Sequence, residues 1–274
     1  EQFENQAMTE ILMNAAANSF TRHGIDHLSP SSLNLWAAEP ALWVMERLLK
    51  RRSPTSAPAV RGRAAELGIQ VGLLDPTLPV TDCVLAAQTT FDREMALSGD
   101  ERREAERQKL AGYVEHGLAE LRQYGVPSAY QEKVSLSLEG VPVPTIGFID
   151  WRFDQHGLVV DLKTAERLPS SISDSHGRQG AVYARAQGNY GMRFAYVKPV
   201  AGKKDGRSVA VYEMSSDDIT RHLEALRQIA TRLGRFLALS DDPHELAGLL
   251  VPDYDRFYWN NATTRANGAT VYGF

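Results

Sequence analysis

Alternating apolar and polar residues between positions 146 and 164 predict two antiparallel strands joined by a short turn at Asp154–Gly157. Asp150, Asp161 and Lys163 fall on one face, because successive side chains of a strand point to opposite sides. Whether the loop has two residues or four, the register places Asp150 opposite Asp161, with Cβ atoms roughly 4.5–5.5 Å apart. The other face would be buried and apolar: Ile149, Trp151, Phe153, Leu158, Val160 and Leu162.

Two carboxylates that face each other destabilise a sheet unless a positive charge compensates them. A divalent cation would do so, since hard cations bind carboxylate oxygens. Lys163, two residues after Asp161 on the same face, can balance charge and orient a water or a phosphate. The alternative is a solvent-exposed polar face, which is typical of strand Asp and Lys residues. The otherwise apolar surroundings favour a metal site.

The first 125 residues have mainly helical patterns. Ser29 is a predicted N-cap with Pro30 as the first helical residue, and Leu28 with Leu33 can pack as a hydrophobic staple. Pro40 is expected to break that helix. Further helices are predicted over residues 1–20, 59–74, 80–97 and 100–124.

After residue 125 the pattern changes to strands with intervening helices. We therefore expect an α+β (mixed α/β) fold, with a central mixed sheet of about five strands flanked by helices and a helical N-terminal half. The tail, 260–274, is predicted to be extended. Besides the hairpin, strands are predicted over 134–138, 194–197 and 209–212, and helices over 174–188, 217–240 and 243–250.

Composition narrows the class of protein. The 274 residues include one cysteine, Cys83, which excludes internal disulfides, a cysteine-based zinc site and a four-cysteine iron–sulfur cluster. No run of 18 or more apolar residues occurs, so no membrane span is expected. A reducing, cytoplasmic setting is the expectation.

The net charge of −4 argues against unspecific binding of nucleic acid over the whole surface. Two local basic clusters could nevertheless contact phosphates, or be solvated loops. The first comprises Arg47, Lys50, Arg51, Arg52, Arg61 and Arg63, and the second Lys198, Lys203, Lys204 and Arg207. Trp36 and Trp43 could stack on bases, although their helical spacing is more typical of a core.

Four short patches, in order, resemble the PD-(D/E)XK nuclease superfamily, and most closely its RecB-like and phage-type exonuclease branch. They are Arg61–Glu66 with its Gly and later acidic residue, Gly147–Asp150, Val160–Thr164, and Gln179–Tyr183. Each patch alone is weak, but all four in order are specific. One departure is Glu66, since many RecB-like members carry a histidine there and the phage-type exonucleases an acidic residue.

The resemblance implies a restriction-endonuclease-like core that hydrolyses phosphodiester bonds with Mg²⁺ or Mn²⁺. It implies one nuclease domain, 1–274, with a helical region 1–125 contributing Glu66, a sheet core 126–240 holding the metal, and a C-terminal extension 241–274. No cofactor-binding residues are predicted apart from the metal ligands. The implied ligands are Glu66, Asp150, Asp161 and the Leu162 carbonyl, and the implied catalytic residues are Glu66, Asp150, Asp161, Lys163, Gln179 and Tyr183.

Each role has a plainer alternative. Lys163 could form an ordinary surface salt bridge, and Glu66 could be a solvated helical residue. Gln179 and Tyr183, at i and i+4 on one helix face, would lie beside the catalytic centre or simply pack. His176 is a weaker candidate for a general base, and Arg178 for a phosphate contact.

The function expected from the resemblance is DNA cleavage by an exonuclease in recombination, repair or phage DNA metabolism, in the cytoplasm of a bacterium or a phage-infected host. A non-catalytic nucleic-acid-binding module on the same fold and a site-specific endonuclease are the alternatives. DNA is the expected partner, and no membrane is. A homo-oligomer, a recombination partner protein, digestion polarity and strand preference stay open.

Overall fold

The computed structural model describes residues 18–188, 190–203 and 206–274, so most of the helix predicted over 1–20 lies outside the described residues. The chain divides into two compact units. The sheet unit comprises Thr55–Val134 and Phe148–Ile219, and the helical unit comprises the chain up to Pro54 together with Ser135–Gly147 and Thr220–Phe274. Every residue of the predicted active site belongs to the sheet unit.

Five strands form one mixed sheet, and their order in it is β1-β2-β3-β4-β5. β3 runs parallel to β4, whereas the β2–β3 and β4–β5 pairs are antiparallel. The α+β class with about five strands is therefore confirmed. The strands are β1 (Ala129–Leu136), β2 (Thr145–Phe153), β3 (Leu158–Thr164), β4 (Gly191–Val197) and β5 (Val209–Glu213).

The β2–β3 hairpin has the four-residue loop. Phe153 pairs with Leu158, and a short 3-10 helix, η3 (Asp154–His156), turns the chain. Gly157 closes the turn with a φ of 55°, a left-handed conformation that glycine adopts without a Cβ penalty. The ladder continues to Trp151↔Val160, so Asp150 and Asp161 follow at the next position of each strand.

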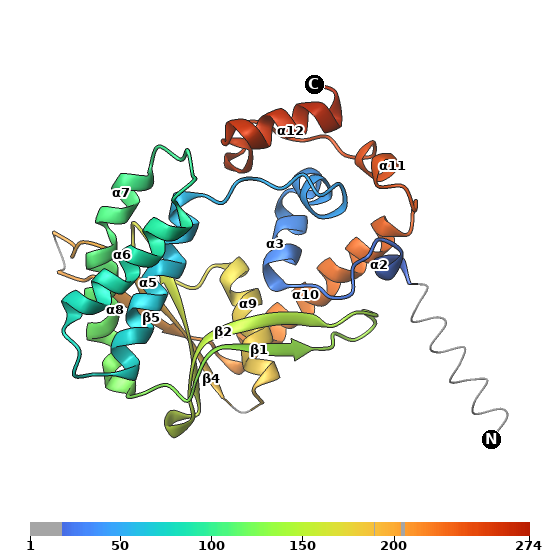
Figure 1. The fold of residues 1–274 in the computed structure, drawn as a ribbon. Coiled ribbons are helices and arrows are strands. Elements are labelled where there is room, and N and C mark those ends of the chain that lie inside the picture. Colours follow the sequence, from blue (N-terminus) through green and yellow to red (C-terminus); the bar gives the residue numbers. More distant parts are fainter. Residues whose placement is uncertain (1–17, 189, 204–205) are drawn as a thin grey trace, which may run out of the picture. The chain divides into compact units, whose positions relative to one another are not determined.

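Helices cover both faces of the sheet in the sheet unit (Figure 1). Apolar side chains of α5, α6 and α8 pack on Trp151, Val160 and Ala195. On the opposite face Gly180 of α9 lies against Phe194 so closely that a Cβ there would come within 2.7 Å of its ring. The helices are α5 (Ala57–Leu74), α6 (Val80–Glu94), α8 (Leu110–Leu121) and α9 (Asp174–Ala186).

The single helix predicted over 100–124 is wrong. The structure has α7 (Arg103–Gln108) and α8 with a break at Lys109, followed by the 3-10 helix η2 (Arg122–Tyr124). Lys109 donates to Glu106 at 3.0 Å and to Glu166 at 2.8 Å. The break thus coincides with the ion pair between Lys109 and the distant Glu166, which the local pattern of apolar residues does not reveal.

In the helical unit the predicted helix start at Ser29 is confirmed. Ser29 caps α3 (Pro30–Ala38) by accepting from the Ser32 N–H at 3.2 Å, and Pro40 begins the separate helix α4 (Pro40–Trp43). Trp36 and Trp43 pack edge to face with centroids 5.5 Å apart. Both are buried, so the core interpretation of these tryptophans is confirmed over base stacking. The unit also contains α2 (Ser19–Arg22), the π-helix η1 (Val44–Leu48), most of α10 (Ser216–Leu237) and α11 (Pro243–Ala247).

The extended tail predicted for 260–274 is also wrong. A 3-10 helix, η4 (Phe257–Trp259), leads into α12 (Ala262–Tyr272), and Asn261 caps it by accepting from the Thr264 N–H at 3.1 Å. Gly268 lies against the buried Trp259 ring, where a Cβ would approach to 2.7 Å. This packing stabilises a helix whose Asn, Gly and Thr content gives it little intrinsic propensity.

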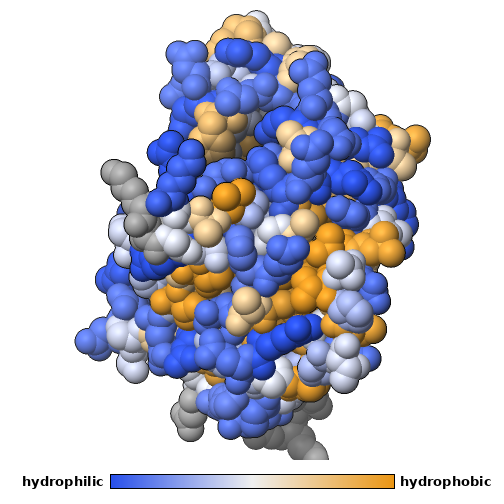
Figure 2. Space-filling model, turned by 90° about the vertical axis from the view of Figure 1, so that its left-hand side faces the viewer, coloured by the Kyte–Doolittle hydropathy of each residue, from blue (hydrophilic) through white to orange (hydrophobic). Residues whose placement is uncertain are grey.

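The face shown in Figure 2 carries mostly hydrophilic residues with smaller hydrophobic groups among them. Exposed large hydrophobic side chains of the sheet unit include Leu74, Leu85 and Val126. Within the described part of the chain, no helix combines the length and the apolar character that crossing a membrane requires.

Candidate active site

The predicted site residues lie around a pocket of about 380 Å³ in the sheet unit. It is formed between the first half of α5, the interior of β2, the second half of β3 and the middle of α9. Its lining includes Glu66, Asp150, Asp161, Leu162, Lys163 and Gln179.

Asp150 and Asp161 are both buried, at 8% and 1% exposure. The Leu162 N–H donates to Asp150 Oδ2 at 2.8 Å, which ties the end of β2 to β3 across the hairpin. Burial and then the neighbouring charge of Asp161 raise the pKa of Asp150 well above its ordinary value. The two carboxylates therefore interact as the hairpin register predicts.

Lys163 compensates part of this negative charge. Its Nζ lies 2.5 Å from Asp161 Oδ2 and donates to Gln179 Oε1 at 3.0 Å. Burial alone would lower the Lys163 pKa, but the charges of Asp161 and Asp150 outweigh it and raise that pKa above its ordinary value. Lys163 is therefore a protonated ammonium in the site.

Glu66 reaches the pocket because α5 packs over the hairpin. One turn further along α5, Gln70 Oε1 accepts from the Trp151 indole N–H at 2.7 Å, which fixes the helix against β2. Burial raises the pKa of Glu66, and a hydrogen bond from Gln131 offsets part of that rise. The sequence left open whether Glu66 is solvated. In the structure it lines the same pocket as Asp150 and Asp161.

Gln179 and Tyr183 project from one face of α9. The Gln179 Nε2 donates to the Tyr183 hydroxyl at 2.8 Å, while its Oε1 accepts from Lys163. These two bonds fix which end of the amide faces the lysine. Tyr183 is buried, and burial raises its pKa above the ordinary value.

His176, near the start of α9, has its Nδ1 2.8 Å from the Tyr196 hydroxyl. Burial, and then the charge of Lys163, lower the pKa of His176 to about 4. It is therefore neutral at neutral pH. Its ring packs against Phe194 and Tyr196, with centroids 5.9 and 5.6 Å away, and these contacts give no support to a role as general base.

The donor set fits a divalent cation. Carboxylate oxygens are the ligands that Mg²⁺ and Mn²⁺ prefer. Oδ2 of the buried Asp161 is paired with Lys163, whereas its Oδ1 has no hydrogen-bond partner among the described residues. The geometry is not that of a closed metal cage: within residues 18–188, 190–203 and 206–274, no three His, Cys, Asp or Glu side chains converge as a metal site. Gln131 and Lys163 contact the carboxylates instead.

Gln131 was not singled out from the sequence. Its Nε2 donates to Glu66 Oε1 and, at 3.3 Å, to Asp150 Oδ1. A lone Gln near the start of a strand matches no motif, and nothing in the local pattern indicates which carboxylates it reaches.

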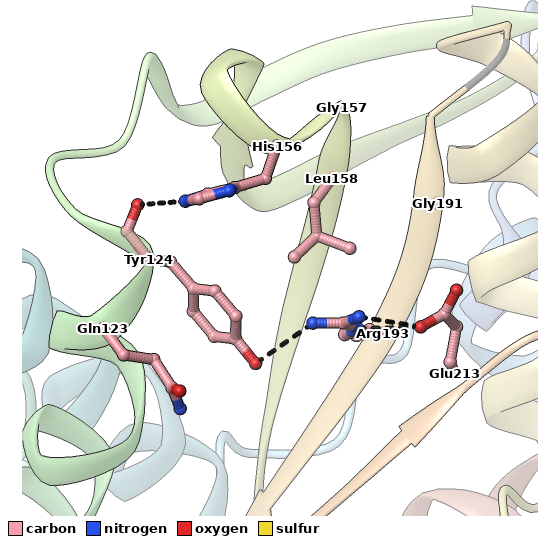
Figure 3. A pocket seen from close by; sticks show the side chains of 8 residues that line it. All are labelled: Gln123, Tyr124, His156, Gly157, Leu158, Gly191, Arg193 and Glu213. Atoms are coloured by element: carbon pink, nitrogen blue, oxygen red, sulfur yellow. Dashed lines mark hydrogen bonds and ion pairs between the residues drawn. The ribbon is translucent and has the colours of Figure 1, made fainter.

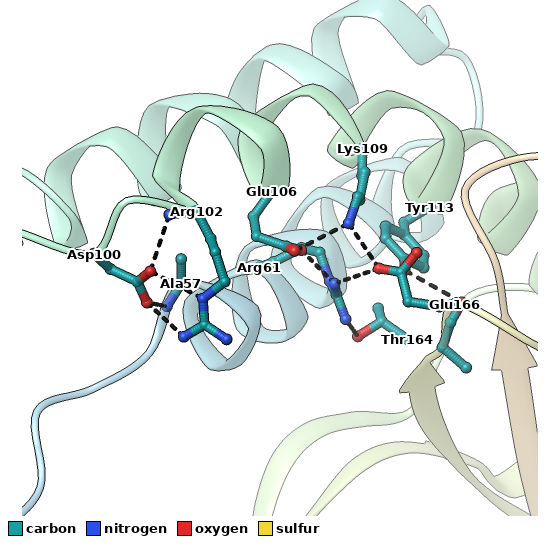
Figure 4. Close-up of polar contacts among 10 residues, drawn as sticks. Ala57, Arg61, Asp100, Arg102, Glu106, Lys109, Tyr113, Thr164 and Glu166 are labelled. Carbon is teal, nitrogen blue, oxygen red and sulfur yellow. Dashed lines mark hydrogen bonds and ion pairs between the residues drawn. The ribbon is translucent and has the colours of Figure 1, made fainter. Parts of the chain in front are cut away.

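Arg61, expected in a basic surface cluster, is buried instead (Figure 4). Its guanidinium pairs with Glu106, lies 3.2 Å from Glu166, and donates to Thr164 Oγ1 at 3.3 Å. Arg63 binds Glu94 with an N–O distance of 2.6 Å. The prediction of a phosphate-contacting patch is therefore wrong for Arg61, whose charge is neutralised within the fold. Lys204 of the second cluster lies outside the described residues.

A larger pocket, of about 520 Å³, lies at the opposite ends of β3 and β4 (Figure 3). Its charged side chains neutralise each other, since Arg193 and Glu213 form an ion pair at 2.9 Å. The Tyr124 hydroxyl accepts from Arg193 at 3.5 Å, and the Tyr124 carbonyl contacts the His156 ring. This pocket has no carboxylate pair left uncompensated, so the smaller one is the candidate active site.

The family model of the PD-(D/E)XK nuclease superfamily matches residues 27–244. The chain belongs to the PD-(D/E)XK nuclease superfamily. All four patches that carried the resemblance fall inside the matched range.

One solved structure has a similar fold over nearly its whole length. The crystal structure of a protein from Eubacterium rectale, named "Putative exonuclease", superposes with a TM-score of 0.56 at 14% identity, covering 92% of this chain and 91% of that one. The structure of SSO0001 matches with a TM-score of 0.32 at 16% identity, covering 61% of this chain and 84% of that one, and this score is too low to indicate a shared fold. No curated protein matches this nuclease-family chain.

Proposed function

We propose that this PD-(D/E)XK protein is a Mg²⁺- or Mn²⁺-dependent deoxyribonuclease that digests DNA from its ends. The observation that carries the proposal is the buried Asp150–Asp161 pair with the protonated Lys163 against it, at the wall of an accessible pocket. The end-dependent mode is supported by the name of the Eubacterium rectale neighbour and by the resemblance to the exonuclease branch.

Glu66, Asp150, Asp161 and the Leu162 carbonyl would hold the cation, which when bound supplies Lewis acidity and lowers the pKa of a water. Lys163 stabilises the negative charge that develops on the scissile phosphate, because its ammonium is already oriented and partly desolvated. Gln179 holds Lys163 through its Oε1, and the Tyr183 hydroxyl holds the Gln179 amide in that orientation. Glu66 of α5 supplies the third carboxylate of the site.

The biological setting belongs to the same proposal. We infer a role in recombination, repair or phage DNA metabolism inside the cell, with the whole chain acting as one nuclease domain. A homo-oligomer or a recombination partner would be compatible with it. RNA cleavage and site-specific internal cleavage are outcomes of the test below.

The test uses linear duplex and single-stranded DNA labelled at each end, closed circular DNA and a matched RNA, with and without Mg²⁺ or Mn²⁺. We expect the linear DNA to be shortened from an end and the circle to stay intact. Lys163→Met should lower the rate by ~10²–10³-fold, because it removes a preorganised positive charge. Lys133→Met, which removes an exposed lysine of β1, is the matched control and should cleave like the wild type.

Cleavage of the closed circular DNA would show that the protein is an endonuclease and not an exonuclease. Equal activity of Lys163→Met and the wild type, with the fold intact in both, would overturn the assignment of this site.

A further inference from the structure

The backbone of β1 is distorted at Gln131. Its φ is 51°, in the left-handed region that non-glycine residues rarely adopt. Among the described residues, Lys50 is the other non-glycine residue with a positive φ. Gln131 is exposed, so burial of its side chain does not compensate the strain. A strained residue inside a strand, next to a candidate site, points to a local requirement.

The distortion re-aims two consecutive side chains. In a regular strand, Tyr130 and Gln131 would point to opposite faces. Here both lie on the side of α5: Tyr130 stacks on the Trp151 ring, whose indole N–H binds Gln70 of α5, with centroids 6.3 Å apart, and Gln131 Nε2 donates to Glu66 Oε1. A one-residue irregularity of this kind is how strands redirect a side chain beside an active site.

Gln131 also connects two separate elements. Its Nε2 carries two N–H groups, and the same nitrogen reaches Glu66 of α5 and Asp150 of β2. Without this amide, Glu66 and Asp150 would still feel the charge of Lys163, and Asp150 would keep the Leu162 N–H, but the Gln131 donor that joins the two carboxylates would be gone. A single amide thus satisfies one oxygen of each carboxylate and leaves the second oxygen of Glu66 free of this bond.

We infer that Gln131 is a positioning residue for the metal-binding carboxylates, whose left-handed backbone aims one amide at Glu66 and Asp150 together and holds them in place for a divalent cation. The inference rests on the proposed function. It assigns to β1 a part in the site that the four sequence patches do not include. Hydrogen-bond partners of metal ligands commonly change metal affinity by 10- to 100-fold when removed.

The test measures Mn²⁺ binding by calorimetry on the full chain without DNA. Gln131→Asn keeps an amide on a residue type that tolerates the left-handed region, but its side chain is too short to bridge both carboxylates. Gln131→Gly removes the side chain and relieves the backbone strain. Gln108→Asn is the matched control, since Gln108 bonds only Glu104 on the surface of α7 among the described contacts.

We expect Gln131→Asn and Gln131→Gly to bind Mn²⁺ about 10- to 100-fold more weakly, with Gln108→Asn unchanged. Gln131→Gly should melt no lower than the wild type in the absence of metal, because the strain is gone. Cleavage by both variants should return to within a few-fold of the wild type at saturating Mn²⁺, since Gln131 acts through the carboxylates.

Wild-type Mn²⁺ affinity in Gln131→Asn would overturn the positioning role, as would a loss of cleavage that saturating Mn²⁺ does not restore. The proposed function would survive either result if Asp161→Asn still abolished Mn²⁺ binding. Failure of the wild type itself to bind Mn²⁺ would overturn both.

Discussion

Lys163 shares a buried pocket with three carboxylates, so the site carries more negative than positive charge. Burial raises the pKa values of Glu66, Asp150 and Asp161, which is the direction expected when desolvated acids lack full compensation. A bound cation would lower these pKa values again, because it favours the charged form of each carboxyl group. The folded protein is therefore expected to be less stable without metal than with it.

This charge excess predicts an unusual pH dependence of stability for the metal-free protein. Because the folded-state pKa of Asp150 is raised, the folded protein binds more protons than the unfolded chain above the ordinary carboxyl range. In the presence of a chelator, stability should therefore fall as the pH rises above the ordinary range of a carboxyl group. Asp150→Asn should lose most of this slope and be more stable by about 1–3 kcal/mol at neutral pH.

Urea unfolding of both proteins across that pH range measures the difference. Parallel stability curves for the wild type and Asp150→Asn would mean that this carboxylate is not perturbed in the folded state.

Helix α5 is held on both sides of Glu66. At its start the Ala57 N–H donates to Asp100 Oδ2 at 2.8 Å, and at its centre Arg61 binds Glu106 (Figure 4). Further on, Gln70 binds Trp151. The Arg61 guanidinium also contacts Thr164, the residue after Lys163. The element that delivers Glu66 is thus fastened to the strand that carries Asp161 and Lys163.

The Arg61–Glu106 pair should be important for stability. Both side chains are 7% exposed, so Arg61→Met would remove the guanidinium from the buried Glu106 and leave it paired with Lys109 alone among the described residues. We expect a loss of about 3–5 kcal/mol in the free energy of unfolding. Arg63→Met is the control from the same helix, because its pair with Glu94 is half exposed and should cost less than about 1 kcal/mol.

Urea titration of the two variants decides the matter. Similar losses for Arg61→Met and Arg63→Met would contradict the account of Arg61 as a buried link between α5 and β3.

The hairpin was predictable because its register depends on a short turn and strict alternation, both of which are local. The same locality explains what was missed. From the sequence, Arg61 resembles a surface residue. Its partners Glu106 and Glu166 are 45 and 105 positions away and lie next to it only in the folded protein. The left-handed φ of Gln131 and the helix break at Lys109 likewise depend on partners brought close by the fold.

Over the whole molecule, the active-site residues all belong to one compact unit, although the chain leaves that unit at Val134 and returns at Phe148. The superfamily match extends beyond this unit, from residue 27 to 244. A ligand that binds the folded state alone stabilises it by mass action. Binding at the pocket should therefore be visible in the unfolding of the protein.

Metal should raise the thermal stability of the intact chain. At Mg²⁺ or Mn²⁺ concentrations about 100 times the dissociation constant, the gain is about 2.7 kcal/mol. Asp161→Asn should show little of it, because it removes the buried carboxylate whose Oδ1 has no hydrogen-bond partner among the described residues. Melting curves with chelator and with either metal measure the shift, and an equal shift in Asp161→Asn would place the metal elsewhere.

The most direct measurement is the rate of cleavage of end-labelled linear DNA by the wild type and Asp161→Asn, each with Mg²⁺, Mn²⁺ or a chelator. The wild type should cleave only with metal, and Asp161→Asn should be slower by at least ~10²-fold while remaining folded. Undiminished cleavage by folded Asp161→Asn, or cleavage by the wild type in chelator, would contradict the account.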